Sequence, residues 1–430
     1  MRIGILSQWF DPEPGPASLP GVLARGLVDR GHDVQVVTGF PNYPTGLLDS
    51  RYRMSRRLDE RIGVVDVRRV ALYPSHDGSV AGRLGNYASF GASAVASGIG
   101  AFRGMDAIWV YASPITVSWP LWATRLTMGI PTVAHALDLW PDTLAVSGFD
   151  HGGLGTRPTR ALLSGWSRLM YRSSTTVAYI SPGVGDVLAA RGVPAGRLAY
   201  VPLWADEQIY RPGGPDLRAR LGIPADAVVL LYAGTLGTAQ GLESLVDAAA
   251  AVRDAKFVCL IAGSGSAAGT LADRVRRSDA GHIRFLGRLP QIRMTELMAT
   301  ADICYIGLRR HPLSEITMPS KTQAVLAAGR AVLAAALGDV ARVVRDSRAG
   351  WAVDPDDAAA IADRIRYAST LGRSGLAALG RNGRDYYDRN FSIRHGVQRI
   401  EDLLADASAR SSRPGRRRAR RPQTSPIVGR

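Results

Sequence analysis

The chain has 430 residues, 46% of them hydrophobic, which is enough for about two or three domains with buried cores. Its formal net charge of +16 is uneven, because residues 410–430 contain eight arginines and no acid and so carry half of the excess. The two cysteines, Cys259 and Cys304, lie in apolar strand-like runs. This excludes a disulfide or metal framework built on cysteine and fits a reducing cytoplasm.

The first half of the chain alternates strands with helices. The opening MRIGILSQWF predicts a strand and lacks the successive regions of a signal peptide. The apolar runs DVQVVT, VVDVRRV, DAIWVY, PTVAHAL, TTVAYI and LAYVPL follow, separated by helical patterns, as in a parallel sheet covered on both faces. The uncharged run Leu84–Phe102 is rich in Gly, Ser and Asn, so we predict a buried helix, with docking on a bilayer surface as the alternative.

The same pattern restarts after a Pro- and Gly-rich segment at 210–227. The runs VVLLYAG, KFVCLIAG, HIRFLG, ADICYIG, RAVLAAA and GWAVDP predict a second domain of similar size. We therefore predict an α/β protein with two Rossmann-like, doubly wound parallel sheets that face a cleft. The predicted parts are an N-terminal domain at 1–205, a C-terminal domain at 206–389, a C-terminal helix at 390–409 and a disordered Arg-rich tail at 410–430.

Any function of the tail at 410–430 would come from its positive charge. Attraction to anionic lipid heads is the functional prediction for it. A solvated terminus and nonspecific nucleic-acid binding are the alternatives, and a nucleic-acid role would rest on the tail alone.

Glycines follow two strands of the second domain. The carboxyl ends of the strands of two facing sheets meet at one cleft, so the loops there are candidate ligand sites. In YAGTLGTAQGLESL, Gly234, Gly237 and Gly241 allow backbone amides to approach an anion closely. In LIAGSGSAAGTL, Gly263 and Gly265 have dinucleotide-fingerprint spacing, and a plain strand-to-helix turn explains them equally well.

The segment HPLSEITMPSK, residues 311–321, follows the strand ADICYIG and belongs to the same cleft. Pro319 favours a first helical turn, so we predict a helix at 322–328 that opens at Pro-Ser-Lys and ends at Gly329. The N–H groups of a helix start together with Lys321 favour a phosphate, and a capped helix with a solvated lysine is the alternative.

A nicotinamide-dependent dehydrogenase is the first rival function. The stretch SQWFDPEPGPASLPG offers only Gly15 and Gly21 among four prolines, and the second strand ends VVTGF, without an acid for a ribose. Both features argue against that reading.

Six segments together resemble a known family. FDPEPGPAS, GHDVQVVTGFPNYPTG, LDLWPD, YAGTLGTAQGLESL, FLGRLP and EITMPSK followed by AAG occur in the order found in retaining glycosyltransferases of family 4, particularly the WbuB-like, fucosamine-transferase-like branch. The resemblance covers about residues 1–405. It implies a GT-B fold whose first domain holds the acceptor and whose second holds a nucleotide-sugar.

The resemblance also implies positions for the donor. Its diphosphate would lie near Gly234–Gly241, which includes Gln240, and near Pro319, Ser320 and Lys321, with the backbone of Gly15 closing from the first domain. Arg288 would lie beside the nucleobase.

The resemblance places Lys321, Glu315, His135 and Asp138 at the reacting sugar. Glu315 would face the sugar hydroxyls, and His135 and Asp138 would lie across the cleft from them. For His135 a satisfied core histidine is the alternative. Asn42 and Tyr43 have ordinary turn chemistry and an implied acceptor role.

The chain departs from the family pattern at two places. Thr238 and Gln240 stand where many relatives carry a basic pair, and Ala324 stands where we expect the second glutamate of the paired-glutamate motif. Loss of a charged hydrogen-bonding partner costs about 1.5 to 3 kcal/mol, or roughly ten- to a hundredfold in affinity. Gln323 substitutes for that glutamate only if the helix presents it to the ligand.

The resulting hypothesis is a cytoplasmic, peripherally membrane-associated enzyme of surface polysaccharide synthesis. It would move a sugar from a nucleotide diphosphate, UDP by analogy, to a hydroxyl of a lipid-linked or saccharide acceptor, with retention and without a cofactor. Since no metal-binding carboxylate pair stands out, we predict metal independence. Same-face attack is favoured over a Glu315 nucleophile. The alternatives are a nucleotide-sugar epimerase of the same architecture and a non-catalytic sugar-nucleotide-binding protein.

Overall fold

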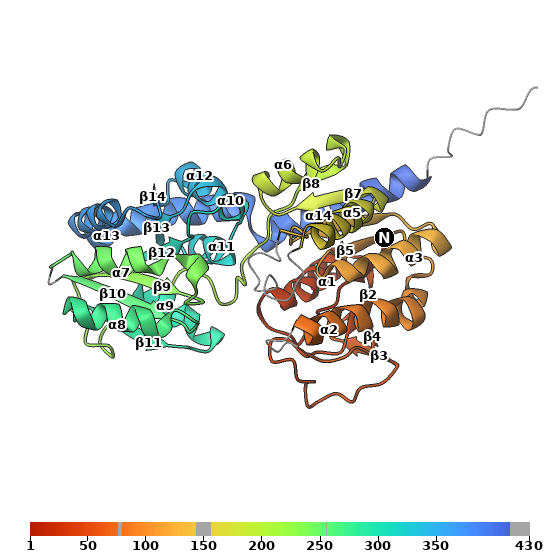
Figure 1. Ribbon diagram of the computed structural model, residues 1–430, viewed down its shortest axis with the longest axis horizontal. Helices are drawn as coiled ribbons and strands as arrows, with labels where there is room; N and C mark the ends of the chain where they lie inside the picture. The colour runs from red at the N-terminus through yellow and green to blue at the C-terminus, as the bar shows by residue number, and fades with distance from the viewer. Residues whose placement is uncertain (76–79, 143–155, 255, 413–430) are drawn as a thin grey trace, which may run out of the picture.

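The computed structural model describes residues 1–75, 80–142, 156–254 and 256–412, which form two α/β domains (Figure 1). Within these residues the N-terminal sheet has the order β3-β4-β2-β1-β5-β6-β7-β8, parallel except for the β3–β4 pair. Its strands are β1 (Arg2–Leu6), β2 (Asp33–Gly39), β3 (Arg57–Ile62), β4 (Val65–Val70), β5 (Ala107–Tyr111), β6 (Thr132–Ala136), β7 (Thr176–Tyr179) and β8 (Leu198–Tyr200).

Helices cover both faces of this sheet. One face packs on α1 (Leu19–Asp29) and α14 (Ile393–Ser412). The other packs on α2 (Val80–Ser93), α3 (Ser118–Met128), α5 (Arg157–Ser173) and α6 (Pro182–Ala190). Short 3-10 turns lie at Gly15–Ser18 (η1), Ile115–Val117 (η4) and Ala195–Arg197 (η6).

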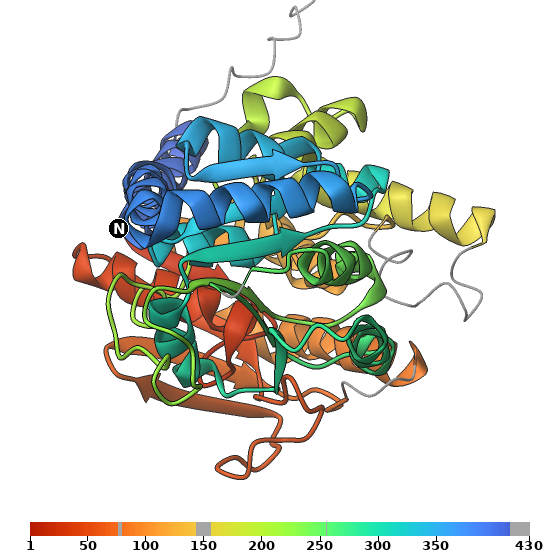
Figure 2. The ribbon, with the colours of Figure 1, turned by 90° about the vertical axis from the view of Figure 1, so that its left-hand side faces the viewer.

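The C-terminal domain repeats the design with the sheet order β11-β10-β9-β12-β13-β14, all parallel (Figure 2). Its strands are β9 (Val228–Ala233), β10 (Phe257–Ala262), β11 (Ile283–Gly287), β12 (Ile303–Gly307), β13 (Ala331–Ala335) and β14 (Gly350–Val353). Its helical elements are η7 (Thr238–Gln240), α7 (Leu242–Ala250), α8 (Ala268–Ser278), η8 (Gln291–Arg293), α9 (Met294–Thr300), α10 (Pro312–Ile316), α11 (Ser320–Ala327), α12 (Gly338–Ser347) and α13 (Ala358–Asn390).

Both sheets confirm the predicted doubly wound α/β class. Residues on alternate sides of one strand pack into different cores, as Val229 and Leu231 do on one face and Val228 and Leu230 on the other. The strand order reverses between β1 and β5 in the first sheet and between β9 and β12 in the second. Ligands of such sheets bind at the carboxyl ends of the strands beside these switch points.

The C-terminal helix belongs to the N-terminal domain, although it follows the second domain in sequence. It begins at Ile393 and extends to Ser412, so residues 410–412 are helical and were wrongly assigned to the tail. Glu401 on α14 pairs with Arg30 and lies 2.8 Å from His32 Nε2, both beyond the end of α1. The rest of the predicted tail, 413–430, lies outside the described residues.

The chain therefore crosses between the domains twice, and Glu207 joins the two crossings. Its Oε1 accepts hydrogen bonds from the Tyr387 hydroxyl at 3.0 Å and from the Ile393 N–H at 2.8 Å. The Tyr387 oxygen in turn accepts from the Ala205 N–H at 3.1 Å. This cluster lies where the two crossings between the domains meet.

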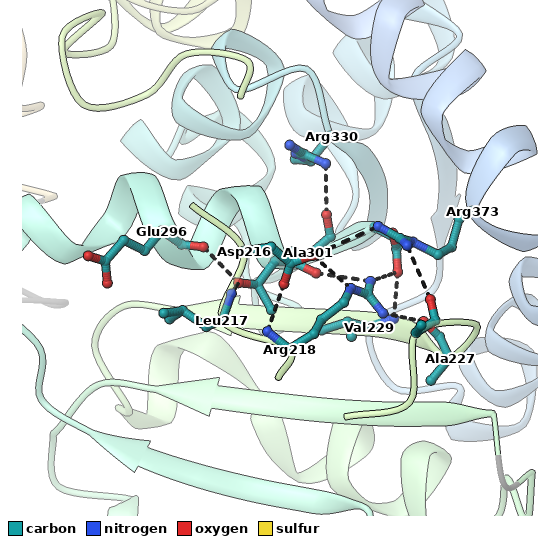
Figure 3. A network of polar contacts seen from close by, with 12 residues as sticks. Asp216, Leu217, Arg218, Ala227, Val229, Glu296, Ala301, Arg330 and Arg373 are labelled. Carbon is teal, nitrogen blue, oxygen red and sulfur yellow. Dashed lines mark hydrogen bonds and ion pairs between the residues drawn. The ribbon is translucent and has the colours of Figure 1, made fainter. Parts of the chain in front are cut away.

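After the first crossing, the segment that contains Arg218 is anchored to the second domain by a buried ion network (Figure 3). Arg218, only 5% exposed, donates to the carbonyls of Ala227 at 2.6 Å and Thr300 at 3.1 Å and pairs with Asp302. Asp302 also accepts from the Val229 N–H at 2.9 Å. Because a buried charge needs such partners, residues from about Leu217 onward belong to the C-terminal domain.

The run Leu84–Phe102 is helical as predicted but only partly buried. It forms the end of α2, a π-helical turn at Ala94–Gly98 and a 3-10 turn at Ile99–Phe102. Phe90 and Phe102 are fully buried, whereas Leu84 is 41% exposed. In the part of the chain that the structure describes, no helix is long and apolar enough to cross a membrane. Cys259 and Cys304 are buried core residues, as predicted.

Candidate active site

A cavity of ≈700 Å³ opens at the carboxyl ends of β9, β10 and β11. Pro14, from the loop after β1, closes it from the opposite domain. It is therefore a cleft between the domains, at the place expected of a donor site. Its lining residues are Pro14, Ala233, Gly234, Thr235, Ala262, Gly263, Ser264, Arg288, Leu289, Pro290, Gln291 and Met294.

Glycines allow the loops after β9 and β10 to touch. The Gly234 N–H donates to the Ala262 carbonyl at 2.9 Å, and the Leu236 N–H donates to the Ser264 carbonyl at 2.9 Å. A Cβ atom added to Gly263 would lie 1.8 Å from the Gly234 oxygen, and one added to Gly265 would lie 2.4 Å from the Leu236 oxygen. No larger residue fits these positions without moving the backbone. The plain strand-to-helix turn thus accounts for Gly265, which does not line the cavity.

The N–H groups of Gly234, Gly237 and Gly241 are engaged within the protein, so the approach of other backbone amides of this loop to an anion stays a prediction. Besides Gly234, the Gly237 N–H donates to Gln240 Oε1 at 3.1 Å and the Gly241 N–H to the Thr238 carbonyl at 3.3 Å. These amides are engaged within the loop because it folds as a short 3-10 turn with its own cap. Gly237, Gln240 and Gly241 therefore shape the loop, and of this set Gly234 lines the cavity.

Lys321 lies beside Gly234 although 87 residues separate them, because β9 and β12 are neighbours at the switch point. Its Nζ donates to the Tyr232 hydroxyl at 2.9 Å and lies 4.1 Å from the centre of the Tyr232 ring. A Cβ atom added to Gly234 would lie 2.9 Å from Nζ. Burial lowers the pKa of Lys321 to about 8, and among the described residues no carboxylate pairs with it.

The helix at Lys321 opens as predicted, with one shift. Pro319 is the extended N-cap residue and α11 begins at Ser320, while Gly329 follows the helix with a φ of 65°. None of Pro319, Ser320 and Lys321 lines the donor cavity, but Lys321 lies directly beside Gly234, which does. Glu315 lies on α10, one short helix earlier, and is exposed.

A second cavity of ≈170 Å³ joins Asp138 to the Glu315 segment. Ile316, Thr317 and Met318 line it from the second domain, and Asp138 lines it from the first. Asp138 accepts a hydrogen bond from the Ser113 hydroxyl, and burial raises the pKa of Asp138. The structure thus brings Asp138 across the cleft from the segment predicted to hold the sugar.

His135 does not reach the cleft, so the structure contradicts its placement at the sugar. Its side chain is fully buried on β6, and Nε2 lies 2.9 Å from the Val201 carbonyl oxygen. Burial lowers the pKa of His135 to about 4, so the ring is neutral. The alternation of the strand directs it toward Trp109 and the core. His135 is therefore a core histidine, but only Nε2 is satisfied, because Nδ1 has no hydrogen-bond partner among the described residues.

Asn42 and Tyr43 line a third cavity of ≈150 Å³ together with Glu13 and Pro14. Glu13 is 3% exposed and accepts hydrogen bonds from three backbone N–H groups, those of Phe10 at 3.1 Å and of Asn42 and Tyr43 at 2.8 Å each. Burial raises the pKa of Glu13 to about 7 against these donors. Because Pro14 lines both this cavity and the donor cavity, Glu13 holds the predicted acceptor turn beside the Gly15 loop.

Helix α11 offers no replacement for the missing second glutamate. Ala324 is 6% exposed, and Gln323 is 2% exposed with its Oε1 unpaired. The helix therefore does not present Gln323 on the cleft surface. Within the described residues, no group of three or more His, Cys, Asp or Glu side chains is arranged to hold a metal ion.

Sequence reasoning missed Tyr232 and Glu13. Tyr232 stands at the end of an apolar strand, where an aromatic residue reads as core, and its partner lies 89 positions away. Glu13 offered one weak signal, an acid between two prolines and two residues before Gly15.

Comparison with known families shows to which family the chain belongs. Residues 15–204 match the family described as Glycosyl transferase 4-like domain, and residues 227–370 match Glycosyl transferases group 1. Each match covers one of the two domains. The chain belongs to glycosyltransferase family 4.

Relatives of this glycosyltransferase cover nearly its whole length. WcaI of Escherichia coli K12, named for colanic acid biosynthesis, is 25% identical over 400 residues, 90% of this chain and 96% of WcaI. The sucrose-phosphate synthase of Thermosynechococcus elongatus has a TM-score of 0.67 at 20% identity and covers 95% and 99% of the two chains. HepE of Anabaena in complex with UDP has a TM-score of 0.66 at 18% identity and covers 94% and 100%. These two structures confirm the GT-B fold.

Proposed function

We propose that this glycosyltransferase moves a sugar from a nucleotide diphosphate to a hydroxyl of a lipid-linked or saccharide acceptor in surface polysaccharide synthesis. UDP is the proposed nucleotide. The assignment of WcaI to colanic acid synthesis supports the pathway class, and the UDP in the HepE complex supports the nucleotide. The WbuB-like branch remains our prediction.

The environment of Lys321 carries this proposal. A half-buried ammonium with a lowered pKa, in the first turn of α11 and without a carboxylate partner among the described residues, is an incomplete ion pair. A diphosphate would complete it by supplying the anion. The neighbouring Gly234 lines a cavity large enough for a nucleotide, and Arg288 borders it at the end of β11.

The proposed reaction needs its charges stabilised at one end of the cleft. As the glycosidic bond breaks, negative charge grows on the departing diphosphate, where Lys321 and the helix start stabilise it. For retention we propose attack from the same face, with a diphosphate oxygen accepting the proton of the acceptor hydroxyl. Asp138 borders the cleft wall opposite residues 316–318, where the transferred sugar would lie.

Two chemical tests follow from this mechanism. The anomeric configuration of the product, measured by proton NMR, should match that of the donor, and an inverted product would contradict the proposal. Activity should persist in excess chelator, since the diphosphate charge is met by Lys321. Loss of activity that added metal restores would disprove metal independence.

The first experiment is a thermal-shift panel with UDP, GDP, ADP and TDP. A ligand that binds only the folded protein raises its melting temperature. We expect a shift with UDP that is absent in Lys321→Ala and retained in Lys256→Ala, whose side chain is exposed and paired with Asp226. Absence of any shift at about millimolar nucleotide, where a Kd of tens of micromolar gives a few kcal/mol, would contradict the donor site.

Ala324 favours one competing function, a protein that binds sugar-nucleotide without transferring it. That protein would show the UDP shift but release no nucleotide with any acceptor. An epimerase would convert the donor without an acceptor, whereas the proposed transferase releases free nucleotide only when an acceptor is present.

A further inference from the structure

A hollow of ≈780 Å³ lies outside the cleft on the N-terminal domain. We call it the arginine groove. Three arginines from β3, β4 and the residue before β3 line one side. The other side consists of the π-helical and 3-10 turns, Arg103 directly after them, and the end of α3. The lining residues of the groove are Arg56, Arg57, Arg68, Val95, Ala96, Ser97, Ile99, Gly100, Arg103, Thr127 and Met128.

The charge of this groove is not neutralised by the protein around it. Asp59 pairs with both Arg57 at 3.2 Å and Arg68 at 2.6 Å. Arg56 donates to the Ser97 hydroxyl at 3.3 Å, but neither Arg56 nor Arg103 has a carboxylate within 4.0 Å among the described residues. Four guanidinium groups therefore share one carboxylate.

The opposite side of the groove combines apolar residues with Arg103, and Gly98 explains how its apolar part forms. A Cβ atom added to Gly98 would lie 2.7 Å from Val37, so the glycine lets the turn lie directly on β2. The turn then presents Val95, Ala96 and Ile99 to the groove. At its α3 edge, Thr127 and Met128 follow Leu126, which is 86% exposed.

The groove is separate from the proposed active site. It shares no lining residue with the three cavities at the cleft. In Figure 1, β3, β4 and α3 lie on the side of the N-terminal domain away from the C-terminal domain. A ligand here would not compete with the donor.

We propose that the arginine groove is a second anion site and that its ligand is the phosphate group of an anionic lipid. Guanidinium groups present paired donors that match phosphate oxygens, which explains the arginine side. The apolar side and Leu126 match the hydrocarbon that a lipid phosphate carries and that a free phosphate lacks. A site of this kind would hold the enzyme on an anionic membrane independently of the tail.

The test compares vesicle binding of full-length variants by cosedimentation, with phosphatidylglycerol mixed into phosphatidylcholine. Arg56→Gln/Arg103→Gln removes the two arginines without a carboxylate partner. Arg276→Gln/Arg366→Gln removes the same charge from exposed positions of the C-terminal domain and is the matched control. Both variants keep the tail, so its attraction to the vesicles is the same in both and does not affect the comparison between them. At about one kcal/mol per arginine near the surface, we expect about thirtyfold weaker binding for the groove variant and about twofold or less for the control.

A second arm distinguishes the source of the phosphate. Leu126→Ser should weaken vesicle binding but leave the binding of soluble glycerol phosphate, measured by calorimetry, unchanged. If the groove variant loses glycerol phosphate while vesicle binding is unaffected, the anion site holds but its ligand is soluble. Equal loss in the groove and control variants, or loss of neither ligand, would overturn the proposal. The nucleotide thermal shift of each variant shows separately whether the donor site is intact.

Discussion

The donor cavity and the arginine groove have similar volumes, ≈700 and ≈780 Å³, yet they hold positive charge in opposite ways. Beside the donor cavity one half-buried ammonium, Lys321, lies in the first turn of α11. At the groove four arginines share one carboxylate, and three of them are exposed. A half-buried single charge gives a strong, geometrically selective interaction, whereas an exposed cluster gives a weaker one that tolerates many anions.

The choice of cation differs as well. The chain has 51 arginines and only two lysines, Lys256 and Lys321. A compact ammonium lies over the Tyr232 ring and beside Gly234, and a planar guanidinium is larger and needs more room. The site therefore needs lysine for its size, and the groove needs arginine for its paired donors.

The largest effect should come from removing the single half-buried charge. Lys321→Ala should lower kcat by about a hundred- to a thousandfold, because a preorganised group that meets the departing charge is lost. Lys321→Arg should not rescue it. Steady-state transfer assays check this, with Lys256→Ala as the control. A wild-type kcat in Lys321→Ala would show that Lys321 does not stabilise the departing diphosphate.

A second way to break the donor site is to separate its two loops. Gly263→Ala places a methyl group against the Gly234 carbonyl at a φ of 148°, so we expect a loss of about 1 to 3 kcal/mol in unfolding free energy and weaker UDP binding. Gly269→Ala on α8, where an added Cβ meets nothing within 4 Å, should stabilise by about 0.5 to 1 kcal/mol. Urea denaturation of both variants measures the difference.

The pH dependence of UDP binding sharpens the contrast further. Below about pH 8 Lys321 is already charged and affinity should be flat. Above its pKa the free protein must take up a proton on binding, because a diphosphate raises that pKa, so affinity should fall by up to about tenfold per pH unit. Calorimetry from about pH 7 to about pH 9.5 tests this. A Lys321→Met variant with the same slope would assign the effect to another group.

The smallest expected effect is that of salt on the donor site. Buried charges are screened much less than exposed ones, so UDP affinity should change by about twofold or less between low and physiological salt. Vesicle binding through the groove should fall severalfold over the same range. If UDP affinity proved as salt-sensitive as vesicle binding, Lys321 would not be shielded as the structure describes.

Much of the fold was predictable because strand and helix patterns are local. Apolar runs mark every strand except the charged antiparallel edge strand β3, which the sequence did not reveal. These runs predict two parallel sheets, and in such sheets the loops after the strands share one cleft. That rule alone brought Gly234 and Lys321 to the same region. It did not identify His135 as a core residue, because the face to which a strand residue points depends on the register of the whole sheet.

Other features follow from contacts between distant segments, which no local pattern records. The sequence predicts a last helix, but its packing on the first domain depends on Glu401 meeting Arg30 and His32. It predicts glycine-rich loops, but hydrogen bonding within the loop occupies the amides of Gly237 and Gly241.

By itself the sequence determined the two-domain α/β architecture, the family and the position of Lys321 at a helix start, since periodicity, glycine placement and motif order are written along the chain. Only the tertiary structure decided how deeply Lys321 is buried, that Tyr232 is its partner, and that four arginines from separate segments enclose one groove. Burial and charge pairing are properties of neighbours in space, and folding alone chooses those neighbours.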